Sequence, residues 1–483
     1  MRFSIYPPIG LARVGNSPAS FYVGPEIPGR PGSEIAADGT ENSIISYKSS
    51  DTEVKRQAAR FRIFENVQGG VPKPAQLPLG AQIEWTVHLV NKKAAIVRPS
   101  GPPTQPKRPQ TAPNSADRLI DAGARTVSGA GASGVKCDQG EFLGRRVPLG
   151  ELRTDVKQNL LVLGGFGFSS SPANTPLTGF YSNTGWHDDA SDGPVTARIH
   201  LVDGTIIDDV APAWVLVGPP DFAPEITGVV TLFDVLLQLG IDHFNVAPPA
   251  QVSFTRDVFS ILKRTRAYQW VNIDPNWSDV SDDWPALANS SAASAPLRSS
   301  QAGVVRNIES ILSRYKLTTL QNSFLDKWVA GTFASDWAGE PVPLNVITAD
   351  GLTRAALDGT VGQGFFPGIE GGIILKDRTL YSGPFDFRLD HAQAQPGDIT
   401  ALMALPWQAD FNDCERGWWP SQRPDEVFPN ATATDRLNWE RGADSYLKMI
   451  NNFAKLGFIT AQKDAQGNVV FAEAQRASSS QFV

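Results

Sequence analysis

Glycine and proline interrupt this chain along its whole length. The 483 residues include 43 glycines and 37 prolines, which is about one residue in six, where an average protein has about one in eight. Glycine frees the backbone and proline removes an amide donor, so both residues favour turns over long helices. Their scattered positions predict many short strands joined by turns rather than a helical bundle.

Hydrophobic patterns predict strands early in the chain and helices later. Strand-like runs cover 83–90 and 160–163, and a hairpin is expected over 197–207. Helical spacing appears at 231–239 before Gly240, at 304–315, and at 446–456 before Gly457, with strands at 458–460 and 469–471 after it. The expected fold class is therefore α+β. A β-rich N-terminal domain is expected over 1–220, and a mixed helical and β domain carrying the active site over 221–483. Segments of low complexity at 100–117, 128–134 and 286–300 are expected to be loops.

Composition excludes several classes of protein. Lys and Arg number 43 against 50 Asp and Glu, a net charge of −7, so there is no basic field to bind nucleic acid or an anionic membrane. No apolar run reaches the roughly 18 residues of a membrane span, and no export signal is recognisable at the start. We expect a soluble, cytoplasmic protein. The two cysteines, Cys137 and Cys414, allow at most one disulfide and no all-cysteine metal site.

Common cofactor motifs are absent. The chain has no phosphate-binding loop and no nucleophile elbow, and Gly164-Gly165-Phe166-Gly167 predicts a plain turn. The five histidines never adopt metal-ligand spacing, so no metal is expected. Asp188, Asp189 and Asp192 could bind a hard cation, but a solvated turn rich in aspartate is the favoured interpretation.

The densest chemistry lies in residues 406–424. Cys414 is surrounded by Asp410, Asp413 and Glu415, whose charges would raise its thiol pKa and weaken it as an ordinary nucleophile. A carboxylate near a cysteine and an indole can instead act as a base for oxidative chemistry on those side chains. The alternative is a packed loop in which the tryptophans belong to the core. The tryptophans of this segment are Trp407, Trp418 and Trp419.

This segment resembles the LodA-like proteins, which are amino-acid oxidases of the lysine ε-oxidase and glycine oxidase type. The resemblance rests on Leu405-Pro406-Trp407-Gln408-Ala409-Asp410-Phe411, on Cys414, and on Trp418-Trp419-Pro420-Ser421-Gln422-Arg423-Pro424. Further stretches that look like the family follow in order along the chain: 9–17, 55–62, 91–95, 151–155, 188–194 and 366–370. A match distributed in this way is more specific than any single motif.

The resemblance implies a cofactor built from the protein's own side chains, cysteine tryptophylquinone. Cys414 matches the family's cysteine, and Asp410 matches the aspartate that serves cofactor assembly and base chemistry. In the family, the tryptophan that joins the cysteine lies downstream of the Trp-Trp-Pro motif. Trp439 is the only tryptophan after Trp419 in this chain, so the resemblance implies that Trp439 is joined to Cys414 through a thioether. If Phe453 stands at the family's tryptophan position instead, no quinone can form.

The implied activity is oxidative deamination of a primary amine or amino acid with O2. The products would be an aldehyde or oxo acid, ammonia and hydrogen peroxide. The candidates to line the substrate pocket are His187, Trp407, Trp418 and Arg423. The alternative interpretations are that His187 lies in a surface turn and that Arg423 forms a structural ion pair. Family members need a separate flavoprotein to form the quinone, and homo-oligomers are common. Two alternatives stay open: a cofactor-free binding or scaffold protein, and an oxidase acting on a peptide or biosynthetic intermediate.

Overall fold

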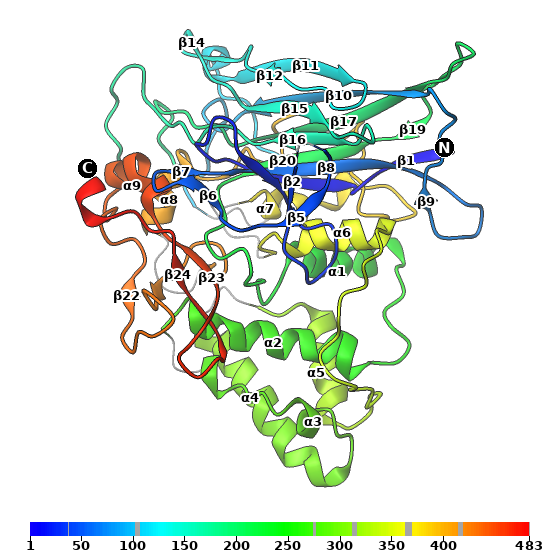
Figure 1. Cartoon of the computed structure of the whole chain (residues 1–483), viewed down its shortest axis with the longest axis vertical. Helices are drawn as coiled ribbons and strands as arrows, with labels where there is room; N and C mark the ends of the chain where they lie inside the picture. The colour runs from blue at the N-terminus through cyan, green and yellow to red at the C-terminus, as the bar shows by residue number, and fades with distance from the viewer. Residues whose placement is uncertain are drawn as a thin grey trace.

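The structure is a computed structural model. It describes 1–36, 38–101, 107–273, 277–311, 316–362, 370–413 and 419–482, with the backbone alone for 308–311. One large sheet occupies the N-terminal half, and nearly all the helices follow it along the chain (Figure 1). The expected α+β class, β-rich first and more helical later, is confirmed.

The described part of the main sheet contains 16 strands. Nine of them form its continuous path, in the order β11 (Ile120–Ser128), β10 (Gln82–Asn91), β17 (Ser191–His200), β20 (Ala213–Gly218), β2 (Ile9–Arg13), β8 (Arg56–Glu65), β16 (Leu160–Leu163), β15 (Gly150–Thr154) and β12 (Val135–Cys137). The two ends of this path lie beside each other, where Arg125 of β11 donates to the carbonyl of Lys136 in β12 (Figure 1). The sheet therefore curls back on itself around an apolar interior.

Seven shorter strands join the main sheet off this path. They are β1 (Phe3–Tyr6), β3 (Phe21–Val23), β4 (Ser33–Ile35), β5 (Glu41–Ser43), β9 (Lys73–Pro74), β18 (Ile206–Ile207) and β19 (Val210–Ala211). Four separate hairpins pair β6 (Lys48–Ser50) with β7 (Glu53–Val54), β13 (Glu141–Phe142) with β14 (Arg145–Arg146), β21 (Glu426–Val427) with β22 (Leu437–Asn438), and β23 (Phe458–Lys463) with β24 (Val469–Ala474).

The strand patterns follow burial. In β10 the apolar residues from Ile83 to Leu89 alternate toward the interior, as expected of a strand with one buried face. All four residues of β16 are buried, because the two faces of the strand pack in different apolar clusters, Leu160 and Val162 in one, Leu161 and Leu163 in the other. The predicted hairpin is present as β17 paired with β18, and the two predicted C-terminal strands are β23 and β24.

Nine α-helices lie within the described residues: α1 (Leu232–Phe244), α2 (Phe259–Ala267), α3 (Trp284–Leu287), α4 (Ala295–Ile311), α5 (Thr319–Val329), α6 (Ala349–Asp358), α7 (Gly372–Leu375), α8 (Trp407–Asp413) and α9 (Tyr446–Asn452). Figure 1 shows α1 and α6 directly under the sheet, α2 to α5 in a lobe farther from it, and α8 and α9 together at one side. None of the described helices is long and apolar enough to cross a membrane.

Two expectations about helices need correction. The helix predicted to stop at Gly240 continues to Phe244 and ends at Asn245, which adopts a left-handed φ of 56°. The segment 286–300 is not a loop, since it holds the end of α3, a 3-10 turn and the start of α4. The helix predicted over 304–315 lies within α4 as far as Ile311, and 312–315 lie outside the described residues.

The largest apolar cluster crosses the midpoint of the chain. It joins buried side chains of the sheet, such as Trp85 and Val215, to Phe222, Phe411 and Trp439 from the second half. The helix that carries Asp410 is therefore packed onto the same core as the sheet. The division at residue 220 stays a prediction.

Candidate active site

Helix α8 carries the predicted aspartate, and its first residue is held by a buried carboxylate. Asp188, fully buried, accepts a hydrogen bond at 3.0 Å from the backbone amide of Trp407, where α8 begins. The first amides of a helix have no partner within the helix, and a carboxylate there also meets the positive end of the helix dipole. Asp188 thus fixes the start of α8 from the sheet side.

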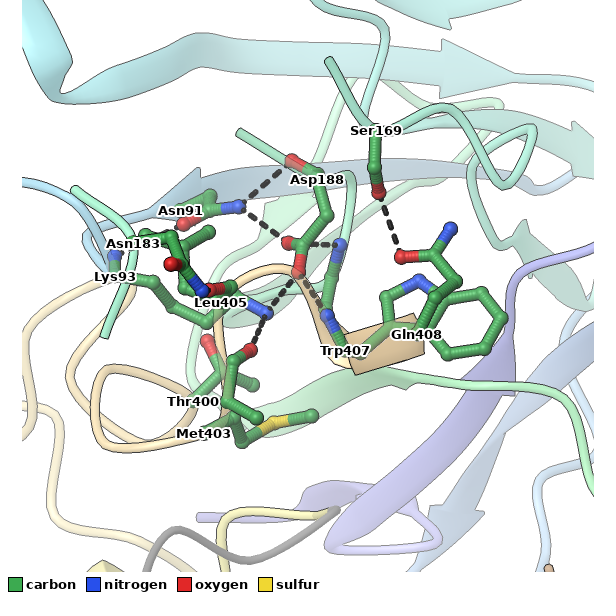
Figure 2. A network of polar contacts seen from close by, with 12 residues as sticks. Asn91, Lys93, Ser169, Asn183, Asp188, Thr400, Met403, Leu405, Trp407 and Gln408 are labelled. Carbon is green, nitrogen blue, oxygen red and sulfur yellow. Dashed lines mark hydrogen bonds and ion pairs between the residues drawn. The ribbon is translucent and has the colours of Figure 1, made fainter. Parts of the chain in front are cut away.

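Lys93 neutralises this buried carboxylate. Its ammonium forms an ion pair with Asp188 and donates to the carbonyl of Ala404 at 2.8 Å. Asn91 donates to both the carbonyl and the carboxylate of Asp188, at 2.9 and 3.1 Å. Burial lowers the pKa of Lys93, and the charge of Asp188 opposes this effect. Figure 2 shows these groups converging on the segment that leads into α8.

A second set of contacts holds the side of α8. The side-chain amide of Gln408 donates to the carbonyl of Gly167 at 3.1 Å. The hydroxyl of Ser169 donates to the side-chain oxygen of Gln408 at 2.7 Å (Figure 2). Asn183 donates to the carbonyl of Leu405 at 2.9 Å. The start of α8 and the residues before it are thereby held by two loops of the sheet half.

Asp410 lies in the middle of α8 with 1% of its surface exposed. Burial lowers the pKa of Arg98 to about 10, and the negative charge of Asp410 opposes this effect. Burial also raises the pKa of Tyr446, and the charge of Asp410 adds to that increase. Arg98 donates to the carbonyls of Lys93 and Met403 at 2.9 and 2.6 Å. Asp410 is thus a buried carboxylate close to an arginine that sequence analysis did not identify.

Trp439 is fully buried beside the other end of α8. Its ring centroid lies 6.4 Å from that of Phe411 and 4.8 Å from that of Phe222. The indole NH donates to the carbonyl of Gly457 at 2.9 Å. The ring is therefore fixed by two aromatic contacts and one hydrogen bond.

Arg423 connects Trp439 to α8. Its Nε donates to the carbonyl of Phe411 at 2.5 Å, and its guanidinium pairs with Glu440 at 2.6 Å and Asp425 at 3.3 Å. The guanidinium carbon lies 5.4 Å from the ring centre of Trp439. This geometry is that of a structural ion pair, and binding of a substrate by Arg423 stays a prediction.

Phe453, the alternative at the tryptophan position, packs one helical turn away, against the first residue of α8. Its ring centroid is 5.1 Å from that of Trp407, in an edge-on contact. Gly167 leaves space for the ring, since a Cβ there would stand 2.3 Å from it. Both aromatic side chains, Trp439 and Phe453, therefore border α8, at different ends.

The structure does not describe every predicted site residue. Cys414 and Trp418 lie outside the described residues, as do Glu415 and Arg416. Trp407 and Trp419 are buried, with 1% of each exposed. Among the predicted site residues that are described, Trp407, Asp410, Trp439 and Arg423 come together on and around α8. Cys137 is buried elsewhere, and burial raises the pKa of its thiol to about 12.

His187 is buried rather than on a surface turn, with 6% of its surface exposed. Its Nε2 is 2.8 Å from the hydroxyl of Ser170, and its ring packs on that of Phe142. Burial lowers the pKa of this imidazole. Contact between His187 and a substrate stays a prediction.

The aspartates that follow His187 do not form a solvated turn, so that interpretation is wrong. Asp188, Asp189 and Asp192 are all at most 1% exposed. Asp192 accepts from the indole of Trp214 at 3.0 Å and from the hydroxyl of Thr400 at 2.6 Å. In the part of the chain that the structure describes, no group of three or more potential ligands could hold a metal ion.

Sequence reasoning missed the partnership of Lys93 with Asp188. Both residues lie in stretches that resemble the family, at 91–95 and 188–194. The resemblance to the family therefore marked both stretches. Neither stretch alone indicates that Lys93 and Asp188 meet at the start of α8. Phe222 gave no signal at all.

Comparisons with known proteins point in one direction. Residues 6–217 match the family described as L-lysine epsilon oxidase N-terminal, and residues 296–439 match the L-lysine epsilon oxidase C-terminal domain. A curated relative, L-lysine 6-oxidase of Marinomonas mediterranea, is 24% identical over 99% of this chain and 90% of the relative.

Solved structures agree in fold. The structure of the ε-lysine oxidase from Marinomonas mediterranea superposes with a TM-score of 0.80 at 23% identity, covering 98% of this chain and 95% of that one. A structure of the Schiff base intermediate of the Marinomonas mediterranea L-Lys epsilon-oxidase with L-Lys gives 0.78 at 22% identity, with the same coverage.

Proposed function

The chain belongs to the L-lysine epsilon oxidase (LodA) family, and on that premise we propose that it is a quinoprotein oxidase of a primary amine or amino acid. The proposed reaction consumes O2 and yields an aldehyde or oxo acid, ammonia and hydrogen peroxide. The observation that carries the proposal is the placement of Trp439 beside the end of α8. Cys414 follows the last residue of that helix directly in sequence.

The described residues fit a cysteine tryptophylquinone on its tryptophan side. Trp439 is fully buried, and its indole NH has a partner in Gly457, so the ring is held in one orientation. Phe411 contacts this ring and precedes Cys414 by only three residues in the sequence, which supports the proposed thioether between Cys414 and Trp439. The quinone would supply an electrophilic carbonyl that accepts the amine and two of its electrons.

The chain's own residues would do three things around this group. Asp410, buried on α8, would take a proton from the carbon next to the substrate nitrogen. Arg423 would keep Trp439 and α8 at a fixed separation. Phe222 and Phe411 would exclude water from the edge of the ring, which strengthens electrostatic interactions inside the site.

L-Lysine is the first substrate to test, because the curated relative is named as a lysine 6-oxidase. The amine that this chain prefers depends on pocket side chains, and at 24% identity those need not be shared. A screen of amino acids and alkylamines with peroxide detection would rank the candidates.

Peptide-level mass spectrometry of protein from its native host is the decisive experiment. The native host is required because a separate flavoprotein is proposed to mature the cofactor. Peptides containing Cys414 and Trp439 joined covalently, with the mass of two added oxygens, would support the proposal. Separate, unmodified peptides from that material would contradict it. They would favour the alternative in which Phe453 occupies the tryptophan position and the chain acts in binding.

A further inference from the structure

A cavity of about 220 Å³ is lined by the segment before β4, by Asp221 and the segment that follows it, by the end of α6, and by Ser421 with Gln422. A smaller cavity of about 50 Å³ shares Asp221 and Gly359 with it. Asp221, on the wall of the cavity, directly precedes Phe222, whose ring packs against that of Trp439, so neighbouring residues of the chain serve the cavity and the proposed quinone site.

Asp221 contributes a carboxylate whose ion pair with Arg13 is long. One oxygen accepts a hydrogen bond from the amide of Ala223 at 2.9 Å, while the other lies 4.0 Å from Arg13, beyond hydrogen-bond distance. Arg13 is engaged elsewhere, because it forms an ion pair with Glu370 and donates to the carbonyl of Gly359 at 2.7 Å. The negative charge of Asp221 is therefore poorly compensated.

Gln422 adds a buried acceptor to the same wall. Its amide nitrogen donates to Glu370 at 2.6 Å, which fixes the amide's orientation. Its Oε1, in a side chain only 1% exposed, accepts no hydrogen bond from any described residue. Buried acceptors are seldom left without a donor in native proteins, so this oxygen indicates a missing donor.

The other charged groups around the cavity are already balanced. Asp358 pairs with Arg264 and Arg354, each at 3.1 Å. Glu225 and Arg30 also line the cavity and carry opposite charges; Arg30 donates to the carbonyl of Pro343 at 2.9 Å, and burial raises the pKa of Glu225, which weakens its negative charge. The carboxylate of Asp221 has no positive group within hydrogen-bond distance among the described residues. A ligand with a single positive charge and hydrogen-bond donors would match it.

Apolar side chains make up much of the remaining wall, which argues against a bare metal ion. The volume also exceeds the space that one coordinated cation needs, and it suits a short alkyl chain. These apolar residues include Pro25, Ile27, Pro31, Pro224, Val361 and Phe471.

We propose that this cavity binds the ammonium group of a small alkylamine, with Asp221 as its counter-ion and the Oε1 of Gln422 as an acceptor. The proposal goes beyond the proposed function, because binding here does not require the quinone. The amine is either the substrate itself or a separate effector, and the experiment distinguishes the two.

Titration calorimetry tests binding in the Cys414→Ser variant, which cannot form the thioether. The probe is 1-aminopentane, which carries one positive charge, and 1-pentanol of the same length is the uncharged control. The amine should bind saturably and at least tenfold more tightly than the alcohol. Asp221→Asn should weaken amine binding at least tenfold, while Asp242→Asn, on the exposed side of α1, should not.

The number of protons released on binding, measured by calorimetry in different buffers, gives a second readout. Burial raises the pKa of Asp221 to about 7, with Glu370 adding to this effect and Arg13 opposing it. A bound ammonium should drive Asp221 to its ionised form, so at pH 7 the protein should release part of a proton. The observed enthalpy should then change with the ionisation enthalpy of the buffer, and this dependence should vanish in Asp221→Asn.

Kinetics of the quinone-bearing enzyme separate the two sources of amine. tert-Butylamine has no hydrogen on the carbon that bears nitrogen, so it can bind but cannot be deaminated. Competitive inhibition that is lost in Asp221→Asn assigns the cavity to the substrate. A change in kcat without competition assigns it to an effector.

The proposal is overturned if 1-aminopentane and 1-pentanol bind equally, if Asp221→Asn leaves amine binding unchanged, or if no saturable binding occurs. The cavity would then hold water only. Unlinked Cys414 and Trp439 peptides would remove the quinone without touching the calorimetric result, so the two failures are distinguishable.

Discussion

Lys93 places a charged amine in the interior, beside the first turn of α8. Removing one partner of a buried ion pair leaves the other charge uncompensated, at a cost of about 3–5 kcal/mol. Lys93→Met should therefore lower the free energy of unfolding by about that amount, since Asp188 is fully buried. Urea denaturation followed by circular dichroism measures the change.

The neighbouring lysine provides the matched control. Lys92 pairs with Asp398 at 2.7 Å, but its side chain is 21% exposed. Lys92→Met should cost no more than about 1 kcal/mol. If both variants lose the same free energy of unfolding, the buried pair of Lys93 with Asp188 stabilises the fold no more than the partly exposed pair of Lys92 with Asp398.

Asp189 should make stability fall as pH rises. Burial, with a smaller contribution from Asp188, raises its pKa to about 7, whereas an unfolded aspartate titrates near pH 3.9. Between about pH 4 and 7 the native chain holds a proton that the unfolded chain has lost, so the stabilisation is complete below pH 4 and is lost by pH 7. The slope should reach about −1.4 kcal/mol per pH unit.

Asp189→Asn tests this slope in urea titrations from pH 4 to pH 8. The variant should lose stability with pH less steeply than the wild type over that range. Asp192, whose pKa burial raises to about 6, contributes equally to both proteins. Parallel curves would show that Asp189 does not titrate in this window.

These aspartates also show where prediction from sequence stops at the residue scale. Asp188, Asp189 and Asp192 have the composition of a turn, and local preference alone predicts exposure. Their burial depends on Lys93, Trp214 and Thr400, which are far away in sequence. A local pattern contains no information about such partners.

At the scale of elements, α8 and the segment of Trp439 are joined by Arg423. Arg423→Met should disrupt this connection and leave Glu440 without its partner. The fraction of chain with Cys414 joined to Trp439 should fall at least tenfold in mass spectra of protein from the native host. Arg423→Lys should retain part of the linkage, because it keeps the charge but loses the forked geometry.

Arg441→Met is the control for this prediction. Arg441 is close in sequence to Trp439, yet it pairs with Glu473 and is partly exposed. Its loss should leave the cross-linked fraction close to that of the wild type. A normal fraction in Arg423→Met would mean that Trp439 is positioned without the guanidinium.

Elements with a strong local pattern were predictable. The alternation in 83–90 and the turn Asp203-Gly204 correspond to β10 and to the hairpin of β17 with β18. Gly240 misled the prediction of a helix end because the chain beyond it still packs, and Asn245 provides the left-handed cap. Composition misled it at 286–300, where Arg298 caps carbonyls of Asn289 and Ser291 and so stabilises a turn rich in serine.

For the whole molecule, a buried network joins the sheet to the C-terminal half. Arg13 of β2 pairs with Glu370, and Gln422 donates to the same carboxylate. Each of the three lies in or beside a stretch that resembles the family. The family pattern thus identified the residues, but only the fold shows that they form one contact.

The shared apolar core predicts that the two halves unfold together. Trp85 and Val215 pack in the same cluster as Phe222 and Trp439, so neither half can lose its packing without exposing the other. Nine of the twelve tryptophans lie after residue 220, so indole fluorescence reports mainly on the second half, while circular dichroism reports on the whole chain. Heating should give one transition with the same midpoint by both probes. Two separate midpoints would instead support independent domains over 1–220 and 221–483.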